Sequence, residues 1–408
     1  MKSVYIDKDD LLIFLDSNKD VAEGYSYEWE GEDVVHIHLS KLDHSFGQVG
    51  TSLWLRQKGS NQTNCPADYQ IKAQSENVVE VIDKNGDKCN VYFIPSQSEM
   101  YSRSKGILEV DILKDKRVMI IGLGSFGSQI AIELAKAGVG QFSLFDFDRV
   151  ELHNLARHTC TINDLGRLKT DAIKEAILGK NKLATVELYP VNINDNVELM
   201  DVQVQKADLV ICATDNNKSR FVLTNSLLKH NKIAIFGRAI TRAEGGDVFR
   251  HRPDGPCYNC LIGSAVNAAA TEEVTSRSQL PAYVSEADAN AMIQVGLSSD
   301  IEPICNLIVK LSLIELSKGK DSGIEELESE LTYDYYMWAN RRERRHQAWA
   351  PFNNAGQKPT ILRWYGARIS KDCNCPTCSA SAILDTGDGL NVTSLDNSDL
   401  TDIVLDTD

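Results

Sequence analysis

The stretch 117–148 constrains the fold more than any other part of the chain. Residues 118–121 are a short, uniformly apolar run, which is typical of a strand buried on both faces of a parallel sheet. The glycine turn G-L-G-S-F-G follows at 122–127, and apolar residues at four-residue spacing then predict a helix. A second predicted strand over 142–145 delivers Asp146 at its carboxyl end. We therefore expect a phosphate-binding strand, turn, helix and strand unit.

A turn of this kind suits a phosphate because of its backbone chemistry. Gly122, Gly124 and Gly127 let the backbone approach the ligand, and the start of the helix presents N–H groups and a positive dipole. Asp146 is placed to accept ribose hydroxyls. The turn alone fits a nicotinamide or flavin enzyme equally well. The residues that follow it decide between these functions.

Length and charge narrow the class of protein. The 408 residues predict two or three domains. The 43 basic and 58 acidic residues give a net charge of -15, which argues against general binding of nucleic acid or of an anionic membrane. The N-terminus is charged and lacks an apolar signal core, and no run of about 18 apolar residues occurs. We expect a cytoplasmic protein.

Composition and periodicity divide the chain into three segments. Residues 1–97 are predicted to form a small β-rich N-terminal domain, and residues 98–378 a doubly wound, mostly parallel α/β domain, because strands and helices alternate from 117 to about 260. Residues 379–408 contain seven Asp and neither Lys nor Arg, which predicts a disordered acidic tail.

The N-terminal domain is predicted to contain strands at 34–42, 52–57, 77–83 and 89–94. His36 and His38 stand in a His-x-His arrangement that Asp43 and His44 follow. This pattern suggests either a metal-dependent isopeptidase or alternating residues on one face of a strand. We favour the strand, because the serine and distant aspartate of such a site do not follow at suitable spacing.

The larger domain has a predicted order of elements. Residues 99–116 predict a short helix and a strand that lead into the nucleotide-binding unit, and residues 261–300 predict a crossover loop or lid. Apolar residues from Ile301 to Leu311 mark one face of a long helix. The remaining predictions are helices at 170–178 and 218–230, strands at 183–193, 207–215 and 232–240, and closing antiparallel strands within 331–343 and 360–370.

Three strings after the glycine turn carry a family resemblance. They are F-D-F-D-R-V-E-L-H-N-L-A-R-H at 145–158, G-R-L-K at 166–169 and A-T-D-N at 213–216. With the turn, they closely resemble the ubiquitin-activating-enzyme-like ThiF/MoeB/HesA superfamily of adenylyltransferases over residues 99–378. The resemblance implies a Rossmann-like fold and a function. That function is ATP- and Mg²⁺-dependent adenylation of the C-terminal carboxylate of a ubiquitin-like or sulfur-carrier protein, with release of pyrophosphate.

The resemblance also implies roles for single residues. Arg157 and Lys169 would place cations on a triphosphate, which a nicotinamide enzyme does not need. Asp215 would bind Mg²⁺. Arg103 resembles an arginine finger that reaches a partner subunit, which implies a homodimer. Many members have glycine where this chain has Ser125. The full implied nucleotide set is Gly122, Gly124, Ser125, Gly127, Asp146, Asn154, Arg157, Lys169, Asp215 and Asn216.

Four of the ten cysteines form two C-x-x-C pairs, Cys257/Cys260 and Cys375/Cys378. Four thiolates suit a closed tetrahedral Zn²⁺ site, and the long separation of the pairs matches the family. Cys373 is an alternative ligand. Residues 261–300 lack the cysteine with which many members form a thioester. Cys305 follows, but it is predicted to be buried and inert on the apolar face of a helix.

Several functions stay open at this stage. The chain also resembles MccB-like, microcin-maturing peptide adenylyltransferases, which have an N-terminal substrate clamp and four zinc cysteines. An NAD-dependent oxidoreductase and an inactive scaffold subunit are further alternatives. The N-terminal domain is expected to dock the carrier protein or a conjugating enzyme. By resemblance alone, the fused domains suggest a prokaryotic ubiquitin-like system in antiviral defence.

Overall fold

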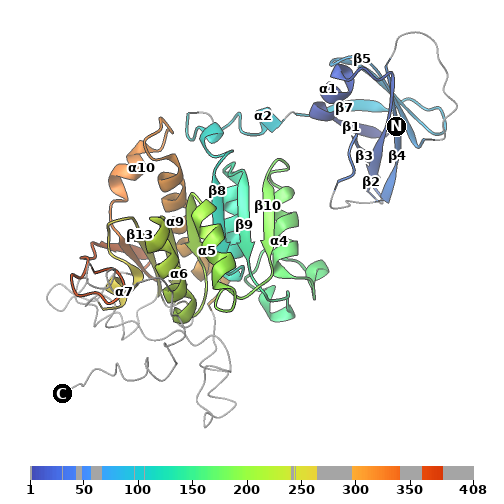
Figure 1. The fold of residues 1–408 in the computed structure, drawn as a ribbon. Helices are drawn as coiled ribbons and strands as arrows, with labels where there is room; N and C mark the ends of the chain where they lie inside the picture. The colour runs from blue at the N-terminus through green and yellow to red at the C-terminus, as the bar shows by residue number, and fades with distance from the viewer. Residues whose placement is uncertain are drawn as a thin grey trace. The chain divides into compact units, whose positions relative to one another are not determined.

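The computed structural model describes residues 2–29, 31–42, 48–56, 67–95, 97–104, 106–239, 243, 245–263, 296–340 and 361–379. The chain divides into two compact units, Met1–Lys105 and Gly106–Asp408 (Figure 1). The sequence places the boundary between residues 97 and 98. Helix α2 (Gln97–Met100) instead belongs to the first unit, and Lys8 Nζ lies 3.3 Å from Glu99 Oε1.

The first unit contains a seven-stranded sheet and helix α1, which is longer than α2 (Figure 1). Strand β1 is parallel to both of its neighbours, β3 and β7, and β4 is parallel to β5, whereas the other pairs are antiparallel. The strand order is β6-β5-β4-β2-β3-β1-β7. The elements are β1 (Ser3–Asp7), α1 (Lys8–Asp16), β2 (Val21–Glu28), β3 (Val34–His38), β4 (Gln48–Arg56), β5 (Tyr69–Ser75), β6 (Val78–Asp83) and β7 (Asn90–Ile94).

One face of this sheet builds the core of the first unit. Side chains alternate across a strand, so Val4 and Ile6 of β1 point inward, where α1 covers them with Leu11 and Phe14. Tyr5, between them, lies on the opposite face and pairs in register with His36. The four strands expected from the sequence are present, whereas β1, β2, β5 and α1 were not predicted.

The larger unit contains an eight-stranded sheet in the order β10-β9-β8-β11-β12-β13-β14-β15. The first five strands in this order are parallel, and the last three are antiparallel. The expected α/β fold with a mostly parallel sheet is therefore confirmed. The strands are β8 (Arg117–Ile121), β9 (Gln141–Phe145), β10 (Thr185–Tyr189), β11 (Leu209–Cys212), β12 (Ala234–Ala239), β13 (Gly245–His251), β14 (Tyr335–Ala339) and β15 (Arg363–Ala367).

Helices cover both faces of this sheet, so it is doubly wound. Val118 and Ile120 pack with α3, α4 and α9, whereas Met119 and Ile121 pack with α5, α6 and α7. This alternation explains why β8 is apolar at all four positions after Arg117. The helices are α3 (Ser125–Lys136), α4 (Lys169–Leu178), α5 (Val197–Lys206), α6 (Asn217–His230), α7 (Tyr258–Ile262), α9 (Ser298–Ser317) and α10 (Glu325–Glu330).

Some sequence expectations need correction or lie outside the described residues. Strand β13 and helix α5 were not predicted, and the strand expected before β8 is a short 3-10 helix, η1 (Val110–Ile112). Most of the crossover 261–300 and nearly all of the acidic tail lie outside the described residues. None of the described helices is long and apolar enough to cross a membrane.

Candidate nucleotide site and cysteine cluster

The strand order reverses between β8 and β11. Strand β8 is followed in the chain by β9 on one side, whereas β11 and β12 continue the sheet on the other. Because all these strands are parallel, the loops that follow β8, β9 and β11 begin at one edge of the sheet. In open α/β sheets this edge, at the point of reversal, is where ligands bind. The glycine turn, Asp146 and the A-T-D-N string all begin there.

In the glycine turn, the backbone lies in close contact with the segment after β11 and with itself. Gly122 has a φ of +85°, and a Cβ there would lie 2.8 Å from the carbonyl oxygen of Ala213, after β11. A Cβ on Gly127 would lie 1.8 Å from the carbonyl oxygen of Gly122. Gly124 is the N-cap of α3 and makes no side-chain cap hydrogen bond. The first N–H groups of α3 are therefore left to a ligand, as in anion-binding helices.

Asp146 fixes the turn from the end of β9. Its Oδ2 accepts a hydrogen bond from Leu123 N at 2.6 Å, and its Oδ1 accepts one from Asp148 N at 2.8 Å. The residue is only 9% exposed, and burial raises the pKa of its carboxyl, while the positive charge of Lys169 opposes that shift. Each carboxylate oxygen keeps a second lone pair with which to accept a further donor.

Lys169 is a buried cation at the first position of α4, with 7% exposure. The positive end of a helix disfavours a cation there. Asp148 compensates, since its Oδ2 lies 2.8 Å from Lys169 Nζ. The role of Lys169 toward a nucleotide stays a prediction.

Asn154 and Arg157 lie in the segment between Asp146 and α4. Asn154 belongs to a capping box, in which its Oδ1 accepts a hydrogen bond from Glu151 N at 2.9 Å. Arg157 is half-buried, and burial lowers the pKa of its guanidinium. Its Nη1 donates to the carbonyl of His153 at 3.3 Å. Asn154 thus shapes the loop that carries Arg157, and a direct contact with a nucleotide stays a prediction for both residues.

Asp215 and Asn216 lie between β11 and α6. Asn216 is the N-cap of α6: its Oδ1 accepts from Ser219 N at 2.9 Å, and its Nδ2 donates to Asp215 Oδ1 at 3.4 Å. Asp215 itself is exposed, and its role as a Mg²⁺ ligand stays a prediction. Arg103 is exposed in the first unit, and its role as an arginine finger stays a prediction.

Two further residues support the same edge and were not singled out from the sequence. Arg220, 2% exposed, donates from Nη2 to the carbonyl of Thr214 at 2.5 Å and from Nη1 to Asn217 Oδ1 at 3.1 Å. His158 lies 2.6 Å, through Nε2, from the carbonyl oxygen of Leu123, and its Nδ1 accepts from Cys160 N at 3.1 Å. These partners assign the proton to Nε2, and burial lowers the pKa of the ring. Only its position in the L-A-R-H string pointed to His158.

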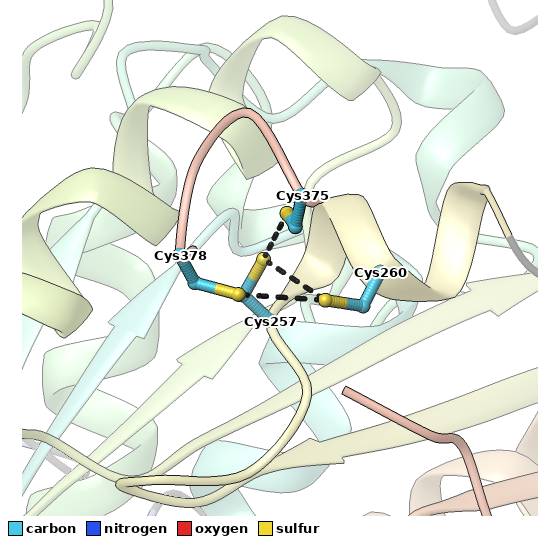
Figure 2. A group of neighbouring side chains, drawn as sticks. All are labelled: Cys257, Cys260, Cys375 and Cys378. Atoms are coloured by element: carbon cyan, nitrogen blue, oxygen red, sulfur yellow. Dashed lines mark hydrogen bonds between the residues drawn. The ribbon is translucent and has the colours of Figure 1, made fainter. Parts of the chain in front are cut away.

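The two C-x-x-C pairs meet in space (Figure 2). Cys257 and Cys260 lie at the start of α7, and Cys375 and Cys378 follow β15. The Sγ atom of Cys257 lies 3.8 Å from that of Cys260 and 3.6 Å from that of Cys375, and those of Cys260 and Cys378 are 3.4 Å apart. All four thiols are buried.

These distances fit a tetrahedral metal site. Thiolates about 2.3 Å from one zinc ion lie about 3.8 Å from each other. Burial raises the pKa of Cys378 to about 12 and also raises that of Cys257. At Cys375 backbone hydrogen bonds from Thr377 and Cys378 outweigh burial and lower the pKa. Cys373 is exposed and outside the cluster. Cys305 is buried, as predicted, and burial raises its pKa as well.

Tyr258 links the cysteine cluster to the sheet edge at which β8, β9 and β11 end, which we call the nucleotide edge. Tyr258 lies between Cys257 and Cys260 in the sequence, and its hydroxyl donates to Asn217 Oδ1 at 3.0 Å. Asn217 is the first residue of α6 and also receives the Arg220 bond. The loop that carries Asp215 is therefore supported from the cysteine side of the sheet.

Comparison with known proteins assigns a family to this arrangement. The chain is 26% identical over 248 residues to ubiquitin-like modifier-activating enzyme 5 of Caenorhabditis elegans, covering 58% of this chain and 56% of that protein. It is 33% identical over 156 residues to the sulfur carrier protein adenylyltransferase of Thermus thermophilus, covering 37% and 56%. This chain thus spans a little over half the length of either relative.

A crystal structure of Escherichia coli MccB with MccA overlaps 70% of this chain and 75% of that one, at 18% identity and a TM-score of 0.49. The ThiF family model matches residues 101–335, which is more than half of the chain and includes the glycine turn, Asp146, Lys169 and Asp215. This chain belongs to the ThiF family.

Proposed function

We propose that this chain is an adenylyltransferase that uses ATP and Mg²⁺ to activate the C-terminal carboxylate of a ubiquitin-like or sulfur-carrier protein. The observation that carries the proposal is the edge at which β8, β9 and β11 end. It combines the uncapped start of α3, the carboxylate of Asp146, the buried cation of Lys169 and the exposed carboxylate of Asp215. The names of the two relatives support a carrier protein as the substrate.

The reaction needs little covalent help from the protein. An oxygen of the carrier carboxylate attacks the α-phosphorus of ATP, and the bond to pyrophosphate breaks, so that acyl-adenylate and pyrophosphate result. Backbone N–H groups of the turn and the charges of Arg157 and Lys169 would stabilise the negative charge that develops. Asp215 would hold Mg²⁺, which neutralises phosphate charge. Catalysis by these residues is positional and electrostatic.

We also propose that Cys257, Cys260, Cys375 and Cys378 bind a structural Zn²⁺. All four coordination positions would be filled by protein thiolates, which leaves none for a substrate. The ion would join α7 to the segment after β15 and would take no part in the reaction. Asn259 Nδ2, which donates to Thr377 Oγ1 at 2.5 Å, strengthens the same junction.

The remaining roles in this proposal concern partners. The β-rich N-terminal domain, expected over residues 1–97, would dock the carrier or a conjugating enzyme, and Arg103 would act in the partner subunit of a homodimer. An equilibrium sedimentation experiment tests the dimer. Mixing inactive Arg103→Ala and Asp215→Ala chains would restore activity if Arg103 acts across the interface.

ATP–pyrophosphate exchange tests the proposed function. Wild type is assayed with candidate carriers ending in Gly-Gly, beside Asp215→Ala and the matched control Asp111→Ala. Asp111 is an exposed carboxylate on η1, 3.6 Å from Lys114. We expect exchange that requires a carrier and falls at least about 100-fold in Asp215→Ala, because an ion held wrongly misplaces the phosphates. Asp111→Ala should match wild type.

Other outcomes would redirect the proposal. Exchange with a short peptide but with no folded carrier would indicate a peptide adenylyltransferase. Protection of the chain by NADH but not by ATP in thermal unfolding would indicate an oxidoreductase. A folded chain that exchanges with neither substrate would be a scaffold.

A further inference from the structure

The first unit contains a second cluster of metal-binding side chains, formed by Asp7, Asp10 and His38. Asp7 is the last residue of β1 and His38 is the last residue of β3, and these two strands are parallel neighbours. Asp10 lies in the first turn of α1, which follows β1 directly. One donor atom from each of the three side chains lies within 4.8 Å of the other two.

Backbone hydrogen bonds hold both carboxylates in place. Oδ1 of Asp7 accepts from Asp9 N at 3.0 Å and from Asp10 N at 3.3 Å, while Oδ2 faces His38. Oδ2 of Asp10 accepts from Leu39 N at 3.0 Å. Ligands of metal ions in proteins are oriented by outer hydrogen bonds of this kind.

The ring of His38 faces both carboxylates. The residue is only 7% exposed, and its Nδ1 faces the carboxylates of Asp7 and Asp10. Its Nδ1 lies 3.4 Å from Asp10 Oδ2 and 3.7 Å from Asp7 Oδ2. These distances exceed the roughly 2.7 to 3.2 Å of an N–H···O hydrogen bond. The three side chains therefore face one another at separations that leave room for an ion between them.

The same distances indicate which ion fits. Nitrogen and oxygen ligands about 2.1 Å from a tetrahedral zinc ion lie about 3.4 Å apart. Octahedral coordination at about 2.1 Å, which Mg²⁺ demands, brings adjacent ligands to about 3.0 Å. The observed separations are therefore closer to the tetrahedral arrangement. Three protein ligands also leave one position open, as in catalytic rather than structural zinc sites.

We propose that Asp7, Asp10 and His38 bind one Zn²⁺ ion in the first unit, with the fourth position open to water or to a donor from another molecule. The proposal does not rest on adenylation. It also separates the two histidines of the His-x-His string. His36 packs its ring against Tyr5 and Trp29, at centroid distances of 5.5 and 4.5 Å, and is not part of the cluster.

The test counts zinc on the full chain. Wild type and variants are dialysed against a series of buffered free Zn²⁺ concentrations, and bound zinc per chain is measured by elemental analysis. The variants are His38→Gln, Asp10→Asn, which keeps an acceptor for Leu39 N, and Asp7→Ser, which still caps α1. We expect each variant to bind one zinc less than wild type, or to bind it at least about 100-fold more weakly.

His36→Gln is the matched control, because it lies on the same strand and face two residues away. It should bind as much zinc as wild type. The cysteine cluster is unchanged in all these chains, so differences report on the first unit alone. Equal zinc in wild type and all three variants, or an equal loss in His36→Gln, would overturn the proposal. Thermal unfolding of Asp10→Asn and Asp7→Ser near the wild-type midpoint would show that any zinc loss is not due to misfolding.

Discussion

Each unit has a junction at which a strand with parallel neighbours leads into a helix. The two junctions present opposite charges to a ligand. In the larger unit β8 is followed by the glycine turn and α3, and in the first unit β1 is followed directly by α1. Both strands have parallel neighbours on each side. The helices differ at their N-caps. Gly124 makes no side-chain hydrogen bond, whereas the carboxylate of Asp7 accepts two N–H groups of its own helix.

This difference in the cap residue gives the two strand-to-helix junctions opposite preferences for the charge of a ligand. An uncapped helix start presents N–H groups and partial positive charge, which attract a phosphate. A helix capped by its own aspartate has already used those N–H groups and presents negative charge instead, which attracts a cation. In our proposals, the strand-to-helix junction provides the location in both units, and the cap residue decides whether an anion or a metal ion binds there.

Replacing Gly127 by alanine would disrupt the junction that we propose to bind phosphate, and this is the largest effect that we expect. The new Cβ would lie 1.8 Å from the carbonyl oxygen of Gly122, so the turn must move. Displacement of a phosphate-binding loop by about 1 Å reduces activity by roughly 100-fold. The measurements are ATP affinity by calorimetry and pyrophosphate exchange. Unchanged values for both would refute the packing described for the turn.

Gly179→Ala is the control for that experiment. Gly179 ends α4 with a φ of -66°, and a Cβ there would be 3.4 Å from its nearest neighbour, the carbonyl oxygen of Glu175. This variant should bind ATP normally. It should also be more stable by about 0.4 to 1 kcal/mol, because alanine restricts the unfolded chain.

Replacing Cys378 by serine would sharpen the comparison by testing whether the two proposed zinc sites are independent. We expect the variant to lose one zinc but to keep the one that depends on His38. Loss of a structural metal should lower the free energy of unfolding by about 4 kcal/mol or more. Chemical denaturation of Cys378→Ser is compared with that of Cys373→Ser, whose exposed thiol lies outside the cluster. Equal stability of the two variants would argue against a metal on the four cysteines.

The smallest effect concerns pH and His158, which supports the anion-binding turn through Leu123. Burial places the pKa of this ring below its unfolded value of about 6.5. As the pH falls, His158 is therefore protonated at a higher pH in the unfolded state than in the folded state. The contribution of His158 to stability is therefore complete above pH 6.5 and is lost below it, until the folded pKa is reached. The loss is about 1.4 kcal/mol for each unit of pKa depression.

Denaturant unfolding at several pH values between 8 and 5 measures this effect. His158→Gln keeps a donor for the Leu123 carbonyl but does not titrate, so its stability should fall less on acidification than that of wild type. His153→Gln, a substitution of an exposed histidine in the same segment, is measured beside it. A wild-type slope in His158→Gln would show that this ring does not titrate differently on folding.

The sequence predicted much of the larger unit because its signals are rare or periodic. The apolar run of β8, the glycine turn and the C-x-x-C pairs are each typical of one kind of local structure, and each is present where expected. The Asp7, Asp10 and His38 cluster was not predicted. Aspartate and histidine are common residues, and only the parallel pairing of β1 with β3 brings these three together. Strand β13 was missed because buried charges such as Arg250 and Asp247 interrupt its apolar pattern.

Arg220 and His158 illustrate a second limit. Both act on backbone carbonyls, Arg220 on Thr214 and His158 on Leu123, and such bonds depend on loop geometry rather than on residue spacing. The roles of Arg103, Asn154 and Asp215 toward a nucleotide remain predictions from the family resemblance. Their placement nevertheless differs, since Asn154 and Asp215 flank the nucleotide edge whereas Arg103 belongs to the first unit.

Because Tyr258 bonds to Asn217, support of the nucleotide edge depends on residues that are synthesised late. Tyr258 lies between two cysteines whose cluster is completed only by Cys375 and Cys378. A ribosome therefore releases the glycine turn, Asp146 and Asp215 long before the last thiols that brace their edge. A chain that terminates early would carry the sequence motifs of its family without their support. Assembly of the four thiols is therefore the last step that stabilises the nucleotide edge.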